Sequence, residues 1–139
     1  MKNSELFLVT TYDHFYKMKA SGRSVVPWFQ TCFSIALVFT ISLSLLLKIT
    51  MDIINGGYYH LVFQEVYFLT AFILVLVMFF FIIKHKYFDS GRHLSLYEEY
   101  LTFSIVDTKK YKFIVLTILC GLPFLLLFII YLDDKYFRI

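Results

Sequence analysis

Three stretches of the chain are almost purely apolar, and each is long enough to cross a lipid bilayer. They cover residues 27–47, 61–83 and 113–132, and none of them contains Lys, Arg or Asp. A helix needs about 20 apolar residues to span the hydrocarbon of a membrane. The stretches lack the alternating pattern of barrel strands, so helices are the only expected spanning form. The pattern predicts an all-α integral membrane protein with three transmembrane helices, forming a single domain over residues 1–139.

The composition supports this prediction. Of the 139 residues 60% are apolar and only 17% are charged, whereas soluble domains average about 45–50% apolar and about 25% charged residues. The excess has to be buried in lipid, because a small soluble core cannot hold it. The composition therefore excludes a soluble enzyme and a disordered tail, and two cysteines are too few for a disulfide scaffold.

The lysines and arginines are unequally distributed, which predicts an orientation. Of the 13, ten lie in residues 1–26 and 84–112, and three lie beside the opposite ends of the apolar stretches. Because Lys and Arg concentrate in cytoplasmic loops, we expect 1–26 and 84–112 in the cytoplasm and 48–60 and 133–139 outside. We therefore expect a multi-pass membrane protein with its N-terminus in the cytoplasm and its C-terminus outside. Its basic charge is attributed to anionic lipid head groups, with no role for nucleic acid.

The first cytoplasmic segment predicts a short interfacial helix. After a strand-like or irregular piece, Tyr12, Phe15 and Tyr16 recur at helical spacing, opposite Lys17, until Gly22 ends the pattern. The favoured interpretation is an anchor at the membrane surface, with aromatic rings at the level of the head groups. The alternative is a helix that docks a partner.

The second cytoplasmic segment, 84–112, predicts a turn at 89–91 and then an amphipathic segment. Ser95 and Glu98 have the spacing of a capping box. The apolar residues at helical spacing are Leu94, Tyr97, Leu101 and Ile105. A surface helix is therefore favoured, and a β-hairpin remains the alternative because 101–106 is rich in β-branched and aromatic residues.

This loop also holds the main group of cytoplasmic charges. They are Glu98, Glu99 and Asp107 and, next to the third apolar stretch, Lys109 and Lys110. Adjacent carboxylates on a surface are usually solvated, so we assign them no catalytic or metal-binding role.

One ionisable residue, Glu65, lies inside an apolar stretch, close to its outer end. Lys48 ends the first stretch on the same side. Ionisable residues within the membrane are functional candidates. We favour an interfacial pair of Glu65 with Lys48, or a neutral carboxyl, over a role in moving protons or ions.

The first apolar stretch carries hydroxyl residues on two faces. Thr31, Ser34 and Ser42 share one face, and Thr40 and Ser44 share the opposite one. Hydroxyl side chains allow close approach and hydrogen bonds between helices. We therefore favour helix packing over the alternative, a water-filled pore lined by hydroxyls in an oligomer.

The third apolar stretch combines a predicted kink with small residues. Pro123 removes a backbone donor and predicts a kink. Thr117 and Gly121, which precede it on the helix, form a small-x-x-x-small pair. With Thr31, Ser34 and Ser42, they are the predicted packing or partner face.

We find no pattern typical of catalysis, of a cofactor site or of a metal site. The four histidines are isolated, and there is no CxxC pair and no Gly-rich phosphate loop. No small-molecule substrate is evident either. We expect the partners to be the lipid bilayer and either another membrane protein or further copies of the chain.

Three short stretches resemble the small inner-membrane immunity proteins that protect bacteria from pore-forming colicins. They are the sequence GYYHLV at 57–62, the basic and aromatic KHKYF at 84–88, and CGLP at 120–123. Three spans with a cytoplasmic N-terminus also fit one branch of that family. The resemblance implies a protein of the bacterial inner membrane that contacts the membrane-inserted helices of a toxin and blocks its channel. The alternatives are an oligomeric ion channel or effector pore, and an accessory subunit of a larger membrane complex.

Overall fold

The computed structural model describes residues 1–55 and 65–136, which form helices joined by short turns, with no strand among them. In chain order the elements are α1 (Asn3–Ala20), α2 (Pro27–Asn55), α3 (Glu65–Ile83), a π-helical segment η1 (Lys84–Asp89), α4 (Arg92–Leu101) and α5 (Ile105–Tyr136). Three of the helices are long and apolar enough to cross a membrane: they are α2, α3 with η1, and α5. The predicted all-α class with three spans is confirmed at this level.

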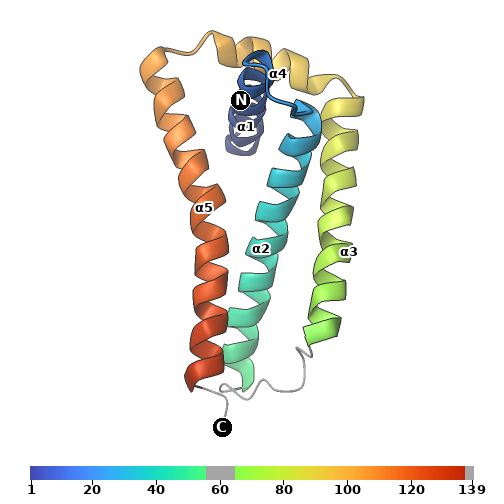
Figure 1. Cartoon of the computed structure of the whole chain (residues 1–139), viewed down its shortest axis with the longest axis vertical. Helices are drawn as coiled ribbons and strands as arrows, with labels where there is room; N and C mark the ends of the chain where they lie inside the picture. The colour runs from blue at the N-terminus through green and yellow to red at the C-terminus, as the bar shows by residue number, and fades with distance from the viewer. Residues whose placement is uncertain (56–64, 137–139) are drawn as a thin grey trace.

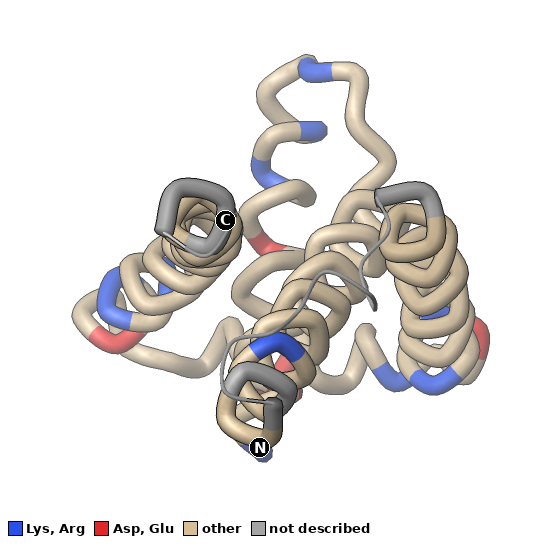
Figure 2. Tube along the Cα trace, turned by 90° about the horizontal axis from the view of Figure 1, so that it is seen from below, with Lys and Arg blue, Asp and Glu red and all other residues tan. Residues whose placement is uncertain are grey.

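The helix α2 is the centre of the arrangement. α3 and α5 lie on opposite sides of it (Figures 1 and 2), and within the described residues they contact α2 but not each other. Helix α4 crosses one end of the bundle, and at that end α1 lies between α2 and α5 and contacts both. We call this end, residues 1–36 and 79–115, the α4 end, and the remaining described residues, 37–55, 65–78 and 116–136, the distal half.

Burial around α2 explains its central position. Cys32 and Ala36 on one face of the helix, and Ile41 on the opposite face, are all almost fully covered. A helix that is apolar on every side is expected to be surrounded by other helices or by lipid. On the side of α3 the contact includes stacked rings of Phe39 and Phe79, with centroids 5.5 Å apart. α2 therefore carries the packing for both neighbours.

The N-terminal segment is one continuous helix, so the predicted strand-like or irregular piece is wrong. Helix α1 runs through the whole of Asn3–Ala20 and ends before Gly22, which adopts a φ of 87°. Its residues Leu8 and Val9 are buried in one cluster with Cys32 and Ala36 of α2. The β-branched run in this segment disfavours a helix only slightly, and burial against α2 outweighs that preference.

The turn predicted at 89–91 is present. Helix α3 continues as η1, and the chain then turns at Ser90 and Gly91, where Gly91 has a φ of 72°. The Ser90 hydroxyl donates to the carbonyl of Lys86 at 2.6 Å and accepts the backbone N–H of Arg92 at 3.4 Å. A single serine thus joins the end of η1 to the start of α4.

The prediction of a helix after this turn is confirmed by α4. The residue at which α4 starts and the face that it buries differ from the prediction. Leu96 and Tyr100 are buried, whereas Leu94 and Leu101 are exposed. The helix begins at Arg92 after Gly91. Ser95 therefore lies within the first turn, where its hydroxyl donates to the carbonyl of Arg92 at 2.9 Å, and it does not cap the helix. The predicted stripe fails because the contacts of α1 and η1, rather than helical spacing alone, select the buried side.

The alternative β-hairpin is wrong, because residues 101–106 end α4 and begin α5. The cap of α5 is Ser104: its hydroxyl accepts the backbone N–H of Asp107 at 3.2 Å and donates to the carboxylate of Asp107 at 2.7 Å. A serine with an acidic residue three positions later is a common start signal for a helix. α5 therefore begins eight residues before the apolar stretch at 113, and it places Lys109 and Lys110 on its first turns.

Candidate functional site

A buried carboxylate joins three helices at the α4 end. The side chain of Asp13 in α1 has no exposed surface, and its Oδ2 lies 2.9 Å from Nζ of Lys17 and 3.1 Å from Nζ of Lys112 in α5. Its Oδ1 accepts a hydrogen bond of 3.2 Å from the hydroxyl of Tyr97 in α4. A buried charge is stable only when it is paired and hydrogen-bonded. Asp13 meets this requirement because α1, α4 and α5 converge on it.

The surroundings of Asp13 shift the protonation of the groups that touch it. Burial, followed by the nearby charge of Asp13, raises the pKa of the Tyr97 hydroxyl to about 12. The hydrogen bond to Asp13 raises the pKa of Lys17 above its usual value. At neutral pH the tyrosine therefore stays a donor and the lysine stays charged.

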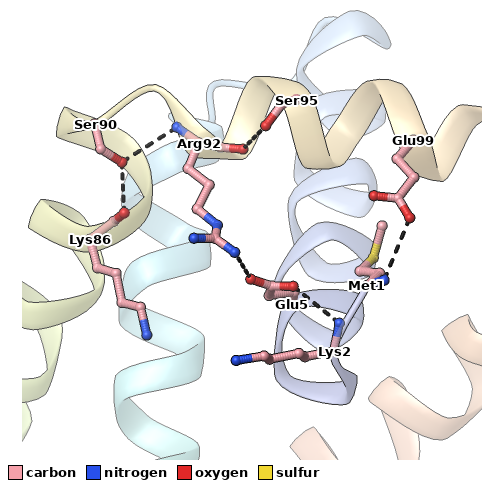
Figure 3. Close-up of polar contacts among 8 residues, drawn as sticks. All are labelled: Met1, Lys2, Glu5, Lys86, Ser90, Arg92, Ser95 and Glu99. Carbon is pink, nitrogen blue, oxygen red and sulfur yellow. Dashed lines mark hydrogen bonds and ion pairs between the residues drawn. The ribbon is translucent and has the colours of Figure 1, made fainter.

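A second carboxylate, Glu5, connects α1 to α4. It is nearly buried, and one of its oxygens forms an ion pair with the guanidinium of Arg92 (Figure 3). Its other oxygen accepts the backbone N–H of Lys2 at 3.0 Å. The hydrogen bond from Lys2, together with the charge of Arg92, lowers the pKa of Glu5. Arg92 reaches Glu5 from the first residue of α4, so this pair sets where the start of α4 lies on α1.

Aromatic rings surround Tyr12 on the same side of α1. Its ring lies 5.5 Å from Tyr97, 5.6 Å from His93 and 5.9 Å from Phe88, between centroids. Nδ1 of His93 lies 3.0 Å from the carbonyl oxygen of Tyr87. Because a carbonyl only accepts, Nδ1 is the donor in this bond. The rings connect α1 to η1 and α4, next to the two carboxylates.

Sequence reasoning missed both carboxylates and their partners. Asp13 and Lys17 stand four residues apart, which is the spacing of an ion pair on a helix, and Glu5 stands three residues after Lys2. These spacings bring the side chains together only if the segment is helical, and a continuous helix from residue 3 was not predicted. Nothing in the sequence pairs Asp13 with Lys112.

The hydroxyl residues of α2 are not buried according to the two faces predicted for them. Thr31 and Thr40, expected on opposite faces, are both buried, whereas Ser34, Ser42 and Ser44 are partly exposed. The hydroxyls of four of them, Thr31, Thr40, Ser42 and Ser44, donate to the carbonyl four residues earlier in α2 itself, at 2.7 to 2.8 Å. Such internal bonds satisfy a hydroxyl in an apolar setting without a partner helix.

The small residues of α5 lie on its uncovered side. Thr117 is exposed and its hydroxyl donates to the carbonyl of Phe113 at 2.8 Å. A Cβ built on Gly121 would meet no atom within 4 Å. The helix α5 continues through Pro123 to Tyr136. The structure therefore does not bring Thr117 and Gly121 together with Thr31 of α2, which is buried elsewhere.

The remaining predicted residues either lie at the surface or fall outside the residues that the structure describes. Glu99 is exposed and lies 3.6 Å from the amino group of Met1 (Figure 3), and Glu98 is exposed beside it. Asp107 belongs to α5, so the three acidic residues of the loop occupy two different helices. The side chain of Glu65 lies outside the described residues, and so does the stretch 57–62 that carries part of the colicin-immunity resemblance. The predicted pair of Glu65 with Lys48 therefore stays a prediction.

Comparisons with protein-family models, with curated proteins and with solved structures found no match for this chain. Among the residues that the structure describes, no group of three or more His, Cys, Asp and Glu side chains could hold a metal ion. The geometry of the bundle is therefore the basis for the proposals below.

Proposed function

We propose that this chain is a non-enzymatic membrane protein that acts by helix–helix contact with a membrane partner, most concretely as an immunity protein against a pore-forming toxin. In this proposal it resides in the bacterial inner membrane with residues 1–26 and 84–112 in the cytoplasm. The partner face is on α5 and is centred on Thr117 and Gly121.

The observation that carries the proposal is the notch on the uncovered side of α5. Thr117 and Gly121 lie between Phe113 and Phe124, two residues that are 72% and 73% exposed. No helix of the described chain enters the space above Gly121. Small residues between large ones let a second helix approach closely, which is how helices associate in lipid. A toxin helix inserted into the membrane fits such a face without any chemical step.

The internal hydrogen bonds of α2 support contact over conduction. Hydroxyls that line an aqueous pore are expected to face one water-filled side. Here Thr31 and Thr40 are buried among the helices of a single chain and donate to their own helix. The alternatives are an oligomeric channel and an accessory subunit of a larger complex. The experiments below distinguish both from the proposed contact with a toxin.

The experiment measures protection of bacterial cells by the wild-type chain and two variants against a panel of purified pore-forming colicins. Gly121→Leu fills the notch, and Leu127→Phe adds bulk at an exposed position of the same helix outside the notch. We expect wild type and Leu127→Phe to protect against at least one toxin and Gly121→Leu to lose that protection. All three should be present in the membrane at equal levels.

Purified wild-type protein in liposomes provides the counter-test. Ion flux without any toxin would identify a channel and contradict the proposal. Purification in a mild detergent followed by mass spectrometry tests the other alternative, because a stoichiometric host protein bound to the chain would identify a subunit.

A further inference from the structure

Two lysines at the α4 end share one carboxylate oxygen. Nζ of Lys17 and Nζ of Lys112 lie 2.9 Å and 3.1 Å from the same Oδ2 of Asp13. The other oxygen of Asp13 is occupied by the hydroxyl of Tyr97. One negative charge thus faces two positive charges, and the group keeps a net charge of about +1 at neutral pH.

The excess positive charge is at the surface. The Asp13 side chain is 0% exposed, whereas those of Lys17 and Lys112 are 60% and 38% exposed. An ammonium group has three N–H donors. The ammonium groups of Lys17 and Lys112 each contact only one oxygen of Asp13, Oδ2. Both groups therefore present unused donors to the outside while the carboxylate below holds them in place, which lowers the entropic cost of binding a ligand between them.

The position of the pair along the helices specifies the kind of ligand. Lys112 directly precedes the apolar stretch that starts at Phe113, and Lys17 lies in the last turn of α1. In a membrane, the end of an apolar stretch is the level of the phosphate groups of lipids. A tetrahedral phosphate with oxygens on several sides can accept from two ammonium groups at once.

We propose that Lys17 and Lys112 form a binding site for a phosphate-class anion, and that the phosphate of an anionic phospholipid is its expected source. Inorganic phosphate is the other source of the same chemistry. The site needs only the membrane setting and the contacts of Asp13, so it is independent of the proposed contact with a toxin.

The test measures phosphatidylglycerol binding to the purified full chain in mild detergent by native mass spectrometry, with inorganic phosphate as a separate probe. The variants are Lys17→Gln and, independently, Lys112→Gln. Each leaves Asp13 paired with the other lysine and with Tyr97, so the fold is retained. The matched control is Lys86→Gln, which removes an exposed charge at the same end of the bundle that is not one of the two cations paired with Asp13.

Each site variant should weaken phosphatidylglycerol binding by about tenfold or more, because it removes a charged donor to the phosphate; tenfold corresponds to about 1.4 kcal/mol. The control should stay within about twofold. If millimolar inorganic phosphate displaces the lipid from wild type, free phosphate shares the site; if it does not, the lipid is the specific occupant. Wild-type affinity for phosphatidylglycerol in both site variants would overturn the proposal, because the two lysines would then not bind the lipid. An equal loss in Lys86→Gln would also overturn it, because the lipid would then be attracted by the basic end as a whole.

Discussion

The two ends of this bundle are stabilised in different ways. At the α4 end, side chains from α1, α2, η1 and α4 form a common buried cluster, and Asp13 and Glu5 connect α1 to α4 and α5. In the described distal half, the buried side chains are all on α2, and α3 and α5 leave large apolar residues uncovered. The α4 end holds its shape through contacts within the chain, whereas the distal half depends on lipid or on another helix for its cover.

The largest effect is expected for Asp13→Ala. The change leaves Lys112 partly buried without its partner and removes the acceptor of Tyr97. Removing one partner of a buried pair costs about 3–5 kcal/mol of unfolding free energy. Titration of the detergent-solubilised protein with SDS measures this loss. The control, Asp89→Ala, removes a more exposed carboxylate that pairs with Lys84 and should change stability by about 1 kcal/mol or less; equal losses for the two variants would contradict a special role for Asp13.

The next largest difference is expected between two leucines. Leu8→Ala in the buried cluster should cost about 2–5 kcal/mol, because the cavity it leaves is surrounded by α1 and α2. Leu127→Ala, at a position that is 63% exposed in the distal half, should change stability by only about 0.5 kcal/mol. The same SDS titration compares them. A large loss for Leu127→Ala would mean that the distal half is packed against a further helix in the sample.

Two tyrosines of α4 provide a finer comparison within the α4 end. Tyr97→Phe removes the hydrogen bond to Asp13 and should cost about 1.5–3 kcal/mol, since the acceptor is charged. Tyr100→Phe removes a buried hydroxyl that lies beside Thr10 without a well-formed hydrogen bond and should be close to neutral. The reactivity of the buried Cys32 thiol, measured in a Cys120→Ser background, reports opening of this end. Faster labelling of Cys32 in Tyr100→Phe than in Tyr97→Phe would mean that the hydroxyl of Tyr100, and not that of Tyr97, stabilises this end.

The smallest effect is expected at Glu5 and depends on pH. Its pKa in the folded protein is below the ordinary value of 4.5 for a glutamate. Folding is therefore favoured by the ionised form above pH 4.5, and this contribution disappears as the pH falls through the lower, folded-state value. Thermal unfolding in detergent at pH 7 and at pH 3 should show a larger loss for wild type than for Glu5→Gln. Equal losses would show that Arg92 and Lys2 do not stabilise the ionised carboxylate.

The membrane helices could be predicted from the sequence because each depends on one long uninterrupted apolar run. Their ends were less predictable. The helix α5 begins at Ile105, before the apolar run, because Ser104 caps it and Asp107 follows three positions later. The face of α4 was predicted around Leu94 and Leu101, yet Leu96 and Tyr100 are buried, because the buried side is selected by contact with α1 and η1, which a pattern within α4 alone does not reveal.

The site was less accessible to sequence reasoning than the fold. Predicted candidates such as Thr117 and Gly121 are local patterns, visible at helical spacing within one segment. The group around Asp13 joins residues from three helices, and the residues that complete it lie far apart in the sequence. Only the ion pair of Asp13 with Lys17, four residues apart on α1, has a local signature.

By itself the sequence determined that the chain has three helices suited to a membrane, because the length of an apolar run and the cost of exposing a backbone in lipid are properties of each segment alone. The tertiary structure decided that α1 lies between α2 and α5 at the α4 end. It also decided that Asp13 is buried against Lys112. A buried charge needs partners, and two of those of Asp13, Lys112 and Tyr97, come from other helices. Whether they reach Asp13 depends on the packing of the whole bundle.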